Sequence, residues 1–195
     1  MTNMSDPLSL SLRLKDATHT LHEDLDKSIM AHGLFSSAEK YKSFVQLQYL
    51  FHRDINDLYK HDQLLEIIPD LATRNRFAQV CQDMRDLNLP FPEAGSSICI
   101  QDASTAVGWL YVAEGSKLGA NFLTKLVEKL GFTENFGGRH LAADPGGRGP
   151  SWNAFKSAID LAGFDPVLAT AGAKSGFMRV KNYMITSDTL ISTSN

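Results

Sequence analysis

The chain has 195 residues, of which 43% are hydrophobic and 21% are charged. This length suits one domain with a single core, and this composition excludes a disordered chain, a collagen-like fibre and a low-complexity protein. The 19 Lys and Arg side chains and 22 Asp and Glu side chains give a formal net charge of -3. Because this charge creates no general positive field, we expect neither nucleic acid nor acidic lipid as a partner.

Cysteine usage and hydropathy both bear on where the protein is found. Cys81 and Cys99 are too few for a disulfide scaffold and lack the spacing of a zinc or redox site. The longest apolar stretch, at about 107–113, is far shorter than a membrane span, and the first thirty residues lack a secretory pattern. We therefore expect a cytoplasmic protein without membrane contact, and a monomer because no partner motif is visible.

The first third of the chain is typical of two amphipathic helices. Apolar residues recur at helical spacing over about 8–30, and Gly33 ends this helix. Ser36 followed by Glu39 has the pattern of a capping box. It predicts a second helix that ends near Lys60.

The middle of the chain is predicted to be helical until prolines interrupt it. A short helical turn is expected at about 64–68, and a third helix over 71–87. Pro90 and Pro92 then prevent a helix. The segment 88–98 is therefore predicted to be a loop.

The second half of the chain predicts three further helices separated by glycine-rich segments. A long helix is expected over about 102–130, and a glycine-rich loop over 137–150. Ser151 is expected to cap a fifth helix, and Asp165 followed by Pro166 is typical of the start of a last helix.

No alternating strand pattern and no internal repeat is visible. The predicted fold class is all-α, with a single compact domain of about six or more helices over 1–195. Residues 1–7 and 188–195 are expected to be flexible ends.

Three glycines lie inside the long predicted helix, where each costs about 1 kcal/mol relative to alanine. Gly108, Gly115 and Gly119 fall within roughly 40° of one another around the helix. They form a bare stripe that either accepts a flat molecule or allows tight helix packing. The pattern alone leaves both interpretations open.

Two histidines lie on the first predicted helix. His22 is at the edge of the apolar stripe, whereas His19 points further toward water. Asp26 lies one turn after His22, where its carboxylate can hold the ring in the tautomer that metal ligation needs. Lys15 lies seven residues before His22 on nearly the same side. The alternatives are a surface histidine and a solvated lysine.

Three segments of the sequence carry a family resemblance. Residues 14–22 read LKDATHTLH and resemble the proximal helix of the haem oxygenase family, in particular of its bacterial members. Residues 108–120 read GWLYVAEGSKLGA and are similar to its glycine-bearing distal helix, and residues 134–142, ENFGGRHLA, to the loop after it. The resemblance spans roughly 12–183.

The resemblance implies an all-α fold in which haem lies between the proximal and distal helices. His22 would be the only protein ligand to the iron, and His19 would be dispensable. Gly115 and Gly119 would let the distal backbone lie against the haem face. The remaining haem-binding positions that the resemblance implies are Lys15, Tyr111 and Phe177.

The residue that follows Gly115 differs from the one in the animal members of the family. Ser116 stands here, where they carry an aspartate that anchors catalytic waters. We count Ser116 with Gly115 and Gly119 as catalytic. Waters are expected on backbone carbonyls and on polar residues of the second helix, for which Gln48, His52 and Arg53 are the candidates.

The implied activity is oxidative cleavage of haem, which acts as both substrate and cofactor. O2 and electrons from an external reductase or ferredoxin would yield biliverdin, CO and ferrous iron, which suits iron acquisition. A neutral histidine ligand fits this chemistry, because a thiolate promotes cleavage of the O–O bond. Lys15 as the propionate anchor predicts mainly the α isomer of biliverdin.

Two other classes of protein are compatible with a helical bundle. A two-metal carboxylate protein needs Glu-x-x-His motifs on two helices, and the histidines of this chain do not form two such motifs. A haem carrier or storage protein would share His22 and the glycine stripe, but it would need no route for electrons or O2.

Overall fold

Every regular element in the described part of the chain is helical, which confirms the all-α prediction. The structure is a computed structural model that describes residues 8–68, 70–92 and 98–192, with side chains up to residue 185. The α-helices are α1 (Leu10–Ala31), α2 (Ala38–Ile55), α3 (Asp62–Ile67), α4 (Phe77–Asp86), α5 (Ala103–Lys129), α6 (Arg148–Leu161) and α7 (Pro166–Ser192). The short 3-10 helices are η1 (Asn56–Lys60), η2 (Leu71–Arg74) and η3 (Arg139–Leu141).

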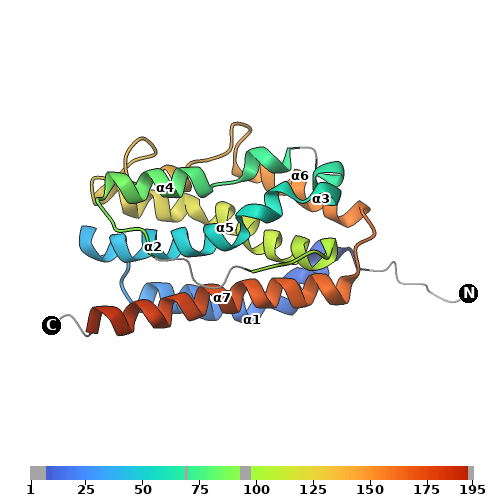
Figure 1. Ribbon diagram of the computed structural model, residues 1–195, viewed down its shortest axis with the longest axis horizontal. Helices are drawn as coiled ribbons and strands as arrows, with labels where there is room; N and C mark the ends of the chain where they lie inside the picture. Colours follow the sequence, from blue (N-terminus) through green and yellow to red (C-terminus); the bar gives the residue numbers. More distant parts are fainter. Residues whose placement is uncertain (1–7, 69, 93–97, 193–195) are drawn as a thin grey trace, which may run out of the picture.

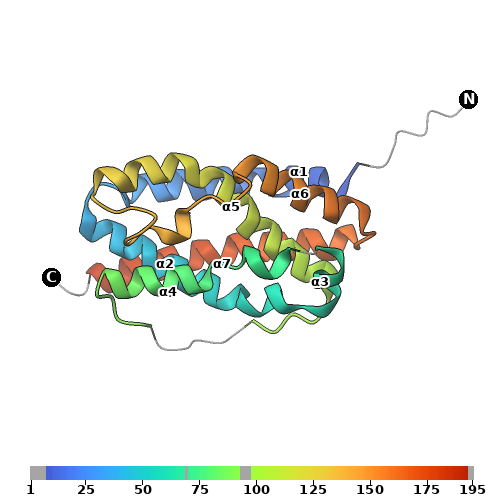
Figure 2. The same cartoon turned by 90° about the horizontal axis from the view of Figure 1, so that it is seen from above.

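The long helices α1, α2, α5 and α7 form one elongated domain (Figure 1). Helix α7 packs along α5 and α1 and also contacts α2, while α4 covers α2 and α6 covers α5. Figure 2 shows α6 beside α1, and α4 and α3 on the other side of the molecule. Helix α7 continues through residues 188–192. Residues 1–7 and 193–195 of the expected flexible ends lie outside the described residues.

Of the two interpretations left open for the glycine stripe, helix packing holds for Gly108. A Cβ atom on Gly108 would lie only 2.0 Å from the carbonyl oxygen of Ala169, and one on Gly172 would lie 2.2 Å from that of Thr105. Each glycine therefore allows the backbones of α5 and α7 to touch. Gly108 serves helix packing, and only the later glycines of α5 are available for another role.

Three predicted helix starts differ from the structure, and the second helix, expected to end near Lys60, ends at Ile55 and is followed by η1. The cap of α2 is Ser37 rather than Ser36, since the Ser37 hydroxyl oxygen accepts a hydrogen bond from the Lys40 amide at 3.2 Å. The predicted helix over 71–87 is interrupted, because the Asn75 side chain accepts a hydrogen bond from the Phe77 amide and starts α4 there.

The third difference concerns α6, which begins three residues before the predicted cap Ser151. Gly147 precedes it with φ of 88°, a left-handed conformation that favours glycine. Pro150 fits within the first turn, where its missing amide donor costs nothing. The expected cap of α7 is confirmed, because Asp165 accepts hydrogen bonds from the Val167 and Leu168 amides.

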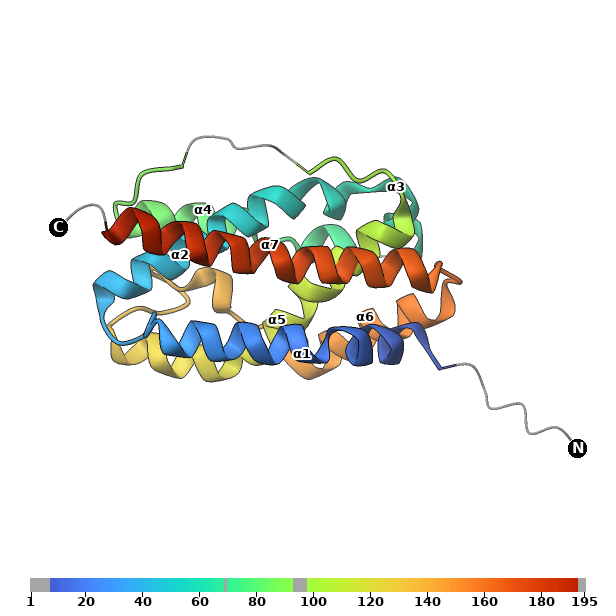
Figure 3. The ribbon, with the colours of Figure 1, turned by 90° about the horizontal axis from the view of Figure 1, so that it is seen from below.

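The bend of α5 positions the site. Figure 3 shows that the N-terminal half of α5 lies near α3, whereas its C-terminal half lies over α1. One apolar cluster, which includes Leu14, Phe51 and Phe155, fills the space among α1, α2, α5, α6 and α7. A second cluster, which includes Tyr41 and Met84, joins α2 and α4 to the C-terminal half of α5. Among the described residues, no helix is long and apolar enough to cross a membrane.

Candidate functional site

The proximal side of the candidate site is the exposed edge of α1. The His22 side chain is 59% exposed, and its Nδ1 atom lies 3.2 Å from Oδ2 of Asp26. Nε2 is therefore the ring nitrogen that is left for a metal. The rings of His22 and Phe177 meet edge to face, with their centroids 5.8 Å apart. The structure thus brings together the predicted iron ligand and the predicted haem contact on α7.

The other histidine of α1 points to a different partner. Nε2 of His19 lies 3.4 Å from Oε1 of Glu23, and the His19 side chain is 67% exposed. Lys15 is exposed on α1 as well. It lies two turns before His22, about 10 Å along the helix, so a flat ligand that reaches from one to the other lies along α1.

Tyr111 of the distal helix packs against α6. Its ring packs on that of Trp152, with centroids 5.3 Å apart. Burial raises the pKa of the Tyr111 hydroxyl to about 12, and the nearby carboxylates of Asp16 and Asp160 add to this effect. The hydroxyl is therefore neutral and can donate a hydrogen bond at physiological pH.

The distal side is a surface of α5 that carries no side chain at two positions. A Cβ atom on Gly119 would meet no atom within 4 Å, and one on Gly115 would lie at ordinary contact distance, 3.6 Å, from the Trp152 ring. Leu118 and Phe122 beside Gly119 are 44% and 57% exposed. The C-terminal half of α5, which lies above α1 in Figure 1, therefore carries exposed apolar side chains beside an open position at Gly119.

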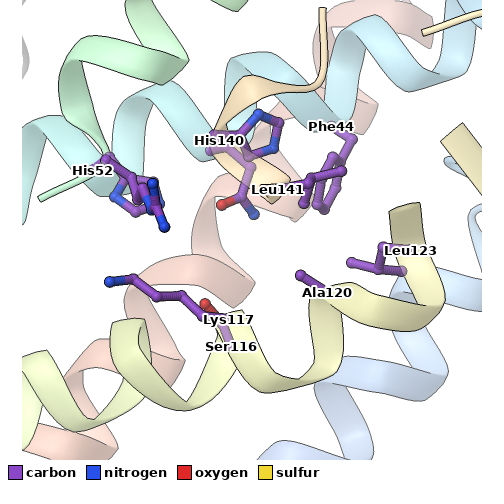
Figure 4. A pocket seen from close by; sticks show the side chains of 10 residues that line it. Phe44, His52, Ser116, Lys117, Ala120, Leu123, His140 and Leu141 are labelled. Atoms are coloured by element: carbon purple, nitrogen blue, oxygen red, sulfur yellow. The ribbon is translucent and has the colours of Figure 1, made fainter. Parts of the chain in front are cut away.

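A small cavity lies on the inner side of α5, between α2 and η3 (Figure 4). We call it the distal cavity. Its volume of about 40 Å³ is enough for one or two water molecules. The residues that line it are Phe44, Gln48, His52, Arg76, Ser116, Lys117, Ala120, Leu123, His140 and Leu141.

The polar groups of the distal cavity include two buried ring nitrogens that need a partner. His52 and His140 are 4% and 5% exposed. Among the described residues, Nδ1 of His52 and Nε2 of His140 have no hydrogen-bond partner. Because a buried unpaired nitrogen costs about 1–3 kcal/mol, the pair supports bound water in this cavity.

The surroundings set the protonation of His52 and the position of the His140 ring. Burial lowers the pKa of His52 to about 3, and the charges of His140, Lys117 and Arg76 add to this effect. Nδ1 of His140 lies 2.7 Å from Oδ2 of the buried Asp83. This carboxylate also accepts hydrogen bonds from the His140 and Arg139 amides, so the His140 ring is fixed in place.

The structure selects among the polar residues predicted to hold distal waters. Gln48 and His52 line the distal cavity together with Ser116. Arg53 does not line it, because its guanidinium group lies over the Tyr49 ring and pairs with Asp54. The Ser116 hydroxyl donates a hydrogen bond to the Ala113 carbonyl at 2.7 Å. Its oxygen can therefore accept one from water.

Sequence reasoning missed several functional candidates. Asp83 and His140 are 57 residues apart, and Glu114 and Arg74, which form a buried ion pair, are 40 apart. No periodicity connects such pairs. The only available signal was Arg139-His140, a basic dipeptide inside a segment that resembles the loop of a known family.

The described residues fit haem better than the alternative metal site. His22 with its carboxylate partner suits an iron ligand, and the open face at Gly119 suits a flat ring. Among the residues that the structure describes, no group of three or more His, Cys, Asp or Glu side chains could hold a metal ion. Nothing here supports the two-metal carboxylate class.

Comparisons with known proteins agree with this geometry. The family model described as heme oxygenase matches residues 8–180. The heme oxygenase PigA of Pseudomonas aeruginosa is 40% identical over 174 residues, which cover 87% of this chain and 88% of that protein. A solved structure of the NO- and CO-bound heme oxygenase from Neisseria meningitidis is 35% identical, with a TM-score of 0.86 over 93% of this chain and 92% of that one. The chain belongs to the haem oxygenase family of haem-degrading enzymes.

Proposed function

We propose that the protein cleaves haem to biliverdin, CO and ferrous iron, with O2 as the oxidant and an external reductase or ferredoxin as the electron donor. The observation that carries this proposal is the combination of an exposed histidine on α1 with an open surface on α5. The exposed His22 with Asp26 lies below an α5 surface that is open at Gly119, and a polar cavity lies behind Ser116. A haem carrier has no need of such a cavity.

On the proximal side, His22 would ligate the haem iron through Nε2, while Asp26 holds the proton at Nδ1. This arrangement keeps the imidazole in one tautomer and increases its basicity. Phe177 would close one edge of the site and limit the rotation of the His22 ring. Lys15 would pair with a propionate, and Tyr111 would line the pocket from α5.

On the distal side, Gly115 and Gly119 would let the helix backbone lie against the ring. Bound haem supplies the iron that activates O2 against a meso carbon of its own ring. Ser116 would accept a hydrogen bond from water at the border of the distal cavity. Gln48, His52 and His140 would hold further waters, and protons would reach the reacting oxygen through them.

The distal groups also limit the strength of the acid beside the ring. His52 is neutral down to about pH 3, so it accepts a hydrogen bond from water and does not donate a proton from an imidazolium. Ser116 carries no charge. Water would thus be the proton carrier nearest the haem, which favours hydroxylation of the ring over early cleavage of the O–O bond.

The reaction needs a supply of electrons, which suits a reducing compartment. Cys81 and Cys99 are free thiols, which fit the reducing cytoplasm that we propose as the compartment. The released ferrous iron gives the reaction a use in iron acquisition from haem. We propose that the protein acts as a monomer.

Turnover of the haem complex tests the proposal against the carrier alternative. Haem is added to the purified protein, and ascorbate or a reductase is supplied in air. We expect the Soret band to disappear while biliverdin absorption and CO appear. A Soret band that persists through this treatment contradicts the proposal and favours a carrier.

A further inference from the structure

A buried ionic network lies on the inner side of α5, next to the distal cavity. Both oxygens of the Glu114 carboxylate are occupied. The Tyr59 hydroxyl donates to Oε1 at 2.9 Å, Arg74 donates to Oε2 at 3.0 Å, and the Lys117 ammonium lies 2.8 Å from Oε1 and 3.0 Å from Oε2. The Glu114 and Arg74 side chains are only 1% and 2% exposed.

Lys117 connects this network to two segments outside α5. Besides Glu114, its ammonium donates a hydrogen bond to the Arg74 carbonyl at 2.7 Å and lies 3.9 Å from the Asp144 carboxylate. Its side chain is 9% exposed. A buried lysine with this many acceptors holds fixed the segments that supply them, in this case η2 and the loop before α6.

The network lies opposite the bare face of the helix. At about 100° per residue, Lys117 is about 160° around the helix from both Gly115 and Gly119. Two interior glycines weaken a helix and make its direction easy to change. The segment that would lie against haem is therefore held from its other side.

The backbone of the same segment is held as well. Arg148, at the start of α6, donates hydrogen bonds to the Lys117 carbonyl at 2.9 Å and to the Thr124 hydroxyl at 3.3 Å. Because Lys117 uses both its ammonium and its carbonyl, it connects α5 with η2 and with α6.

Lys117 also belongs to the distal cavity. In Figure 4 its side chain extends from α5 toward His52. The titratable and charged groups that line the cavity with His52 are His140 from η3, Lys117 from α5 and Arg76 before α4. All three lower the pKa of His52 in addition to the effect of burial.

We propose that Lys117 is a positioning residue for the haem reaction: its buried ammonium, held by Glu114 and the Arg74 carbonyl, fixes the glycine segment of α5 at the distance that the ring requires. The proposal rests on the function proposed above. The same ammonium supports the neutral state of His52, so Lys117 sets both the position of the distal backbone and the charge of the cavity behind it.

The haem-free protein gives the first test. Lys117→Met keeps the length of the side chain and leaves Glu114 paired with Arg74 and Tyr59. Loss of a buried charged hydrogen bond predicts at least about tenfold faster hydrogen exchange at amides 119–123. NMR titration of the His52 ring is expected to show protonation at a higher pH than in the wild type. Lys125→Met, at an exposed position of the same helix, is the matched control and is expected to change neither.

The haem complex gives the second test. Lys117→Met is expected to lower kcat with little change in haem affinity, to give a pH profile displaced from that of the wild type, and to be partly rescued in Lys117→Arg. If Lys117→Met does not fold, the same measurements are made on Glu114→Gln, which weakens the same contact. If hydrogen exchange and the His52 titration in Lys117→Met equal those of the wild type, and the wild type turns over haem, the inference is overturned and the proposed function is not. Absence of turnover in the wild type overturns the proposed function instead.

Discussion

At the scale of the residue, the candidate ligand is notable for its exposure. His52 and His140 are buried and held by the fold, whereas His22 is 59% exposed and has one carboxylate neighbour. A buried histidine cannot bind a large ring, because other side chains already surround it. A histidine at the exposed edge of a helix still has room for one.

Gly119 provides a direct test of the open face. Gly119→Leu adds a side chain where a Cβ atom meets no neighbour, so we expect the free energy of unfolding to rise by up to about 1 kcal/mol from helix propensity. Haem turnover is expected to fall at least about tenfold, because the side chain occupies the ring's position. Urea unfolding and single-turnover kinetics measure the two effects.

The matched control for this substitution is Asn121→Leu, at an exposed position two residues further along α5. It makes a smaller gain in helix propensity, on a different face of the helix. We expect it to keep wild-type turnover. Normal turnover in Gly119→Leu would show that the bare face is not where haem lies.

His52 makes stability depend on pH in a defined direction. Its pKa is about 3 in the folded protein and about 6.5 when exposed. The unfolded chain therefore binds more protons between these values, and stability is lost as pH falls below about 6.5. We expect His52→Gln to reduce this dependence by up to about 1.4 kcal/mol per pH unit, measured by urea unfolding from about pH 7 to pH 4.

The control for the pH experiment is His19→Gln, which removes an exposed histidine from the same protein. It is expected to keep the wild-type dependence on pH. If His52→Gln and the wild type lose stability in parallel as the pH falls, His52 is not held neutral by the fold.

At the scale of the element, the glycines of α5 serve two different purposes. Gly108 allows contact with the backbone of α7, whereas Gly119 faces open space. The sequence places both on one stripe. Only the neighbours that the fold brings to each position separate the two roles.

Gly108→Ala tests this division. A methyl group there would lie 2.0 Å from the Ala169 carbonyl oxygen, so α5 and α7 must move apart. We expect the free energy of unfolding to fall by about 1–3 kcal/mol, with haem affinity largely kept in the folded protein. Urea unfolding and a haem titration measure these quantities. Unchanged stability would contradict the close approach of the two helices.

Local patterns predicted the helices well, because caps and apolar periodicity act within a few residues. Asp165 as the cap of α7 is confirmed. The break before α4 was missed, although asparagine is a residue type that favours the start of a helix. The Asp83 contact with His140 and the network around Glu114 were missed because residues far apart in sequence meet only through tertiary packing.

At the scale of the whole molecule, the orientation of the ring determines which isomer of biliverdin forms. Lys15 lies on α1 two turns before His22, and we expect it to hold a propionate and to favour the α isomer. Chromatography of the product checks this, and Lys15→Ala is expected to lower the α fraction. Lys27→Ala, at another exposed lysine of α1, is the control. A β or δ majority in the wild type would contradict the role of Lys15.

The central claim is that haem binds between α1 and α5 with His22 as its only protein ligand. Resonance Raman spectroscopy of the ferrous haem complex, prepared with and without 15N-labelled histidine, tests it most directly. We predict an iron–nitrogen band that shifts with the label in the wild type and in His19→Ala and is absent in His22→Ala. A labelled band that persists in His22→Ala, or that disappears in His19→Ala, would contradict the claim.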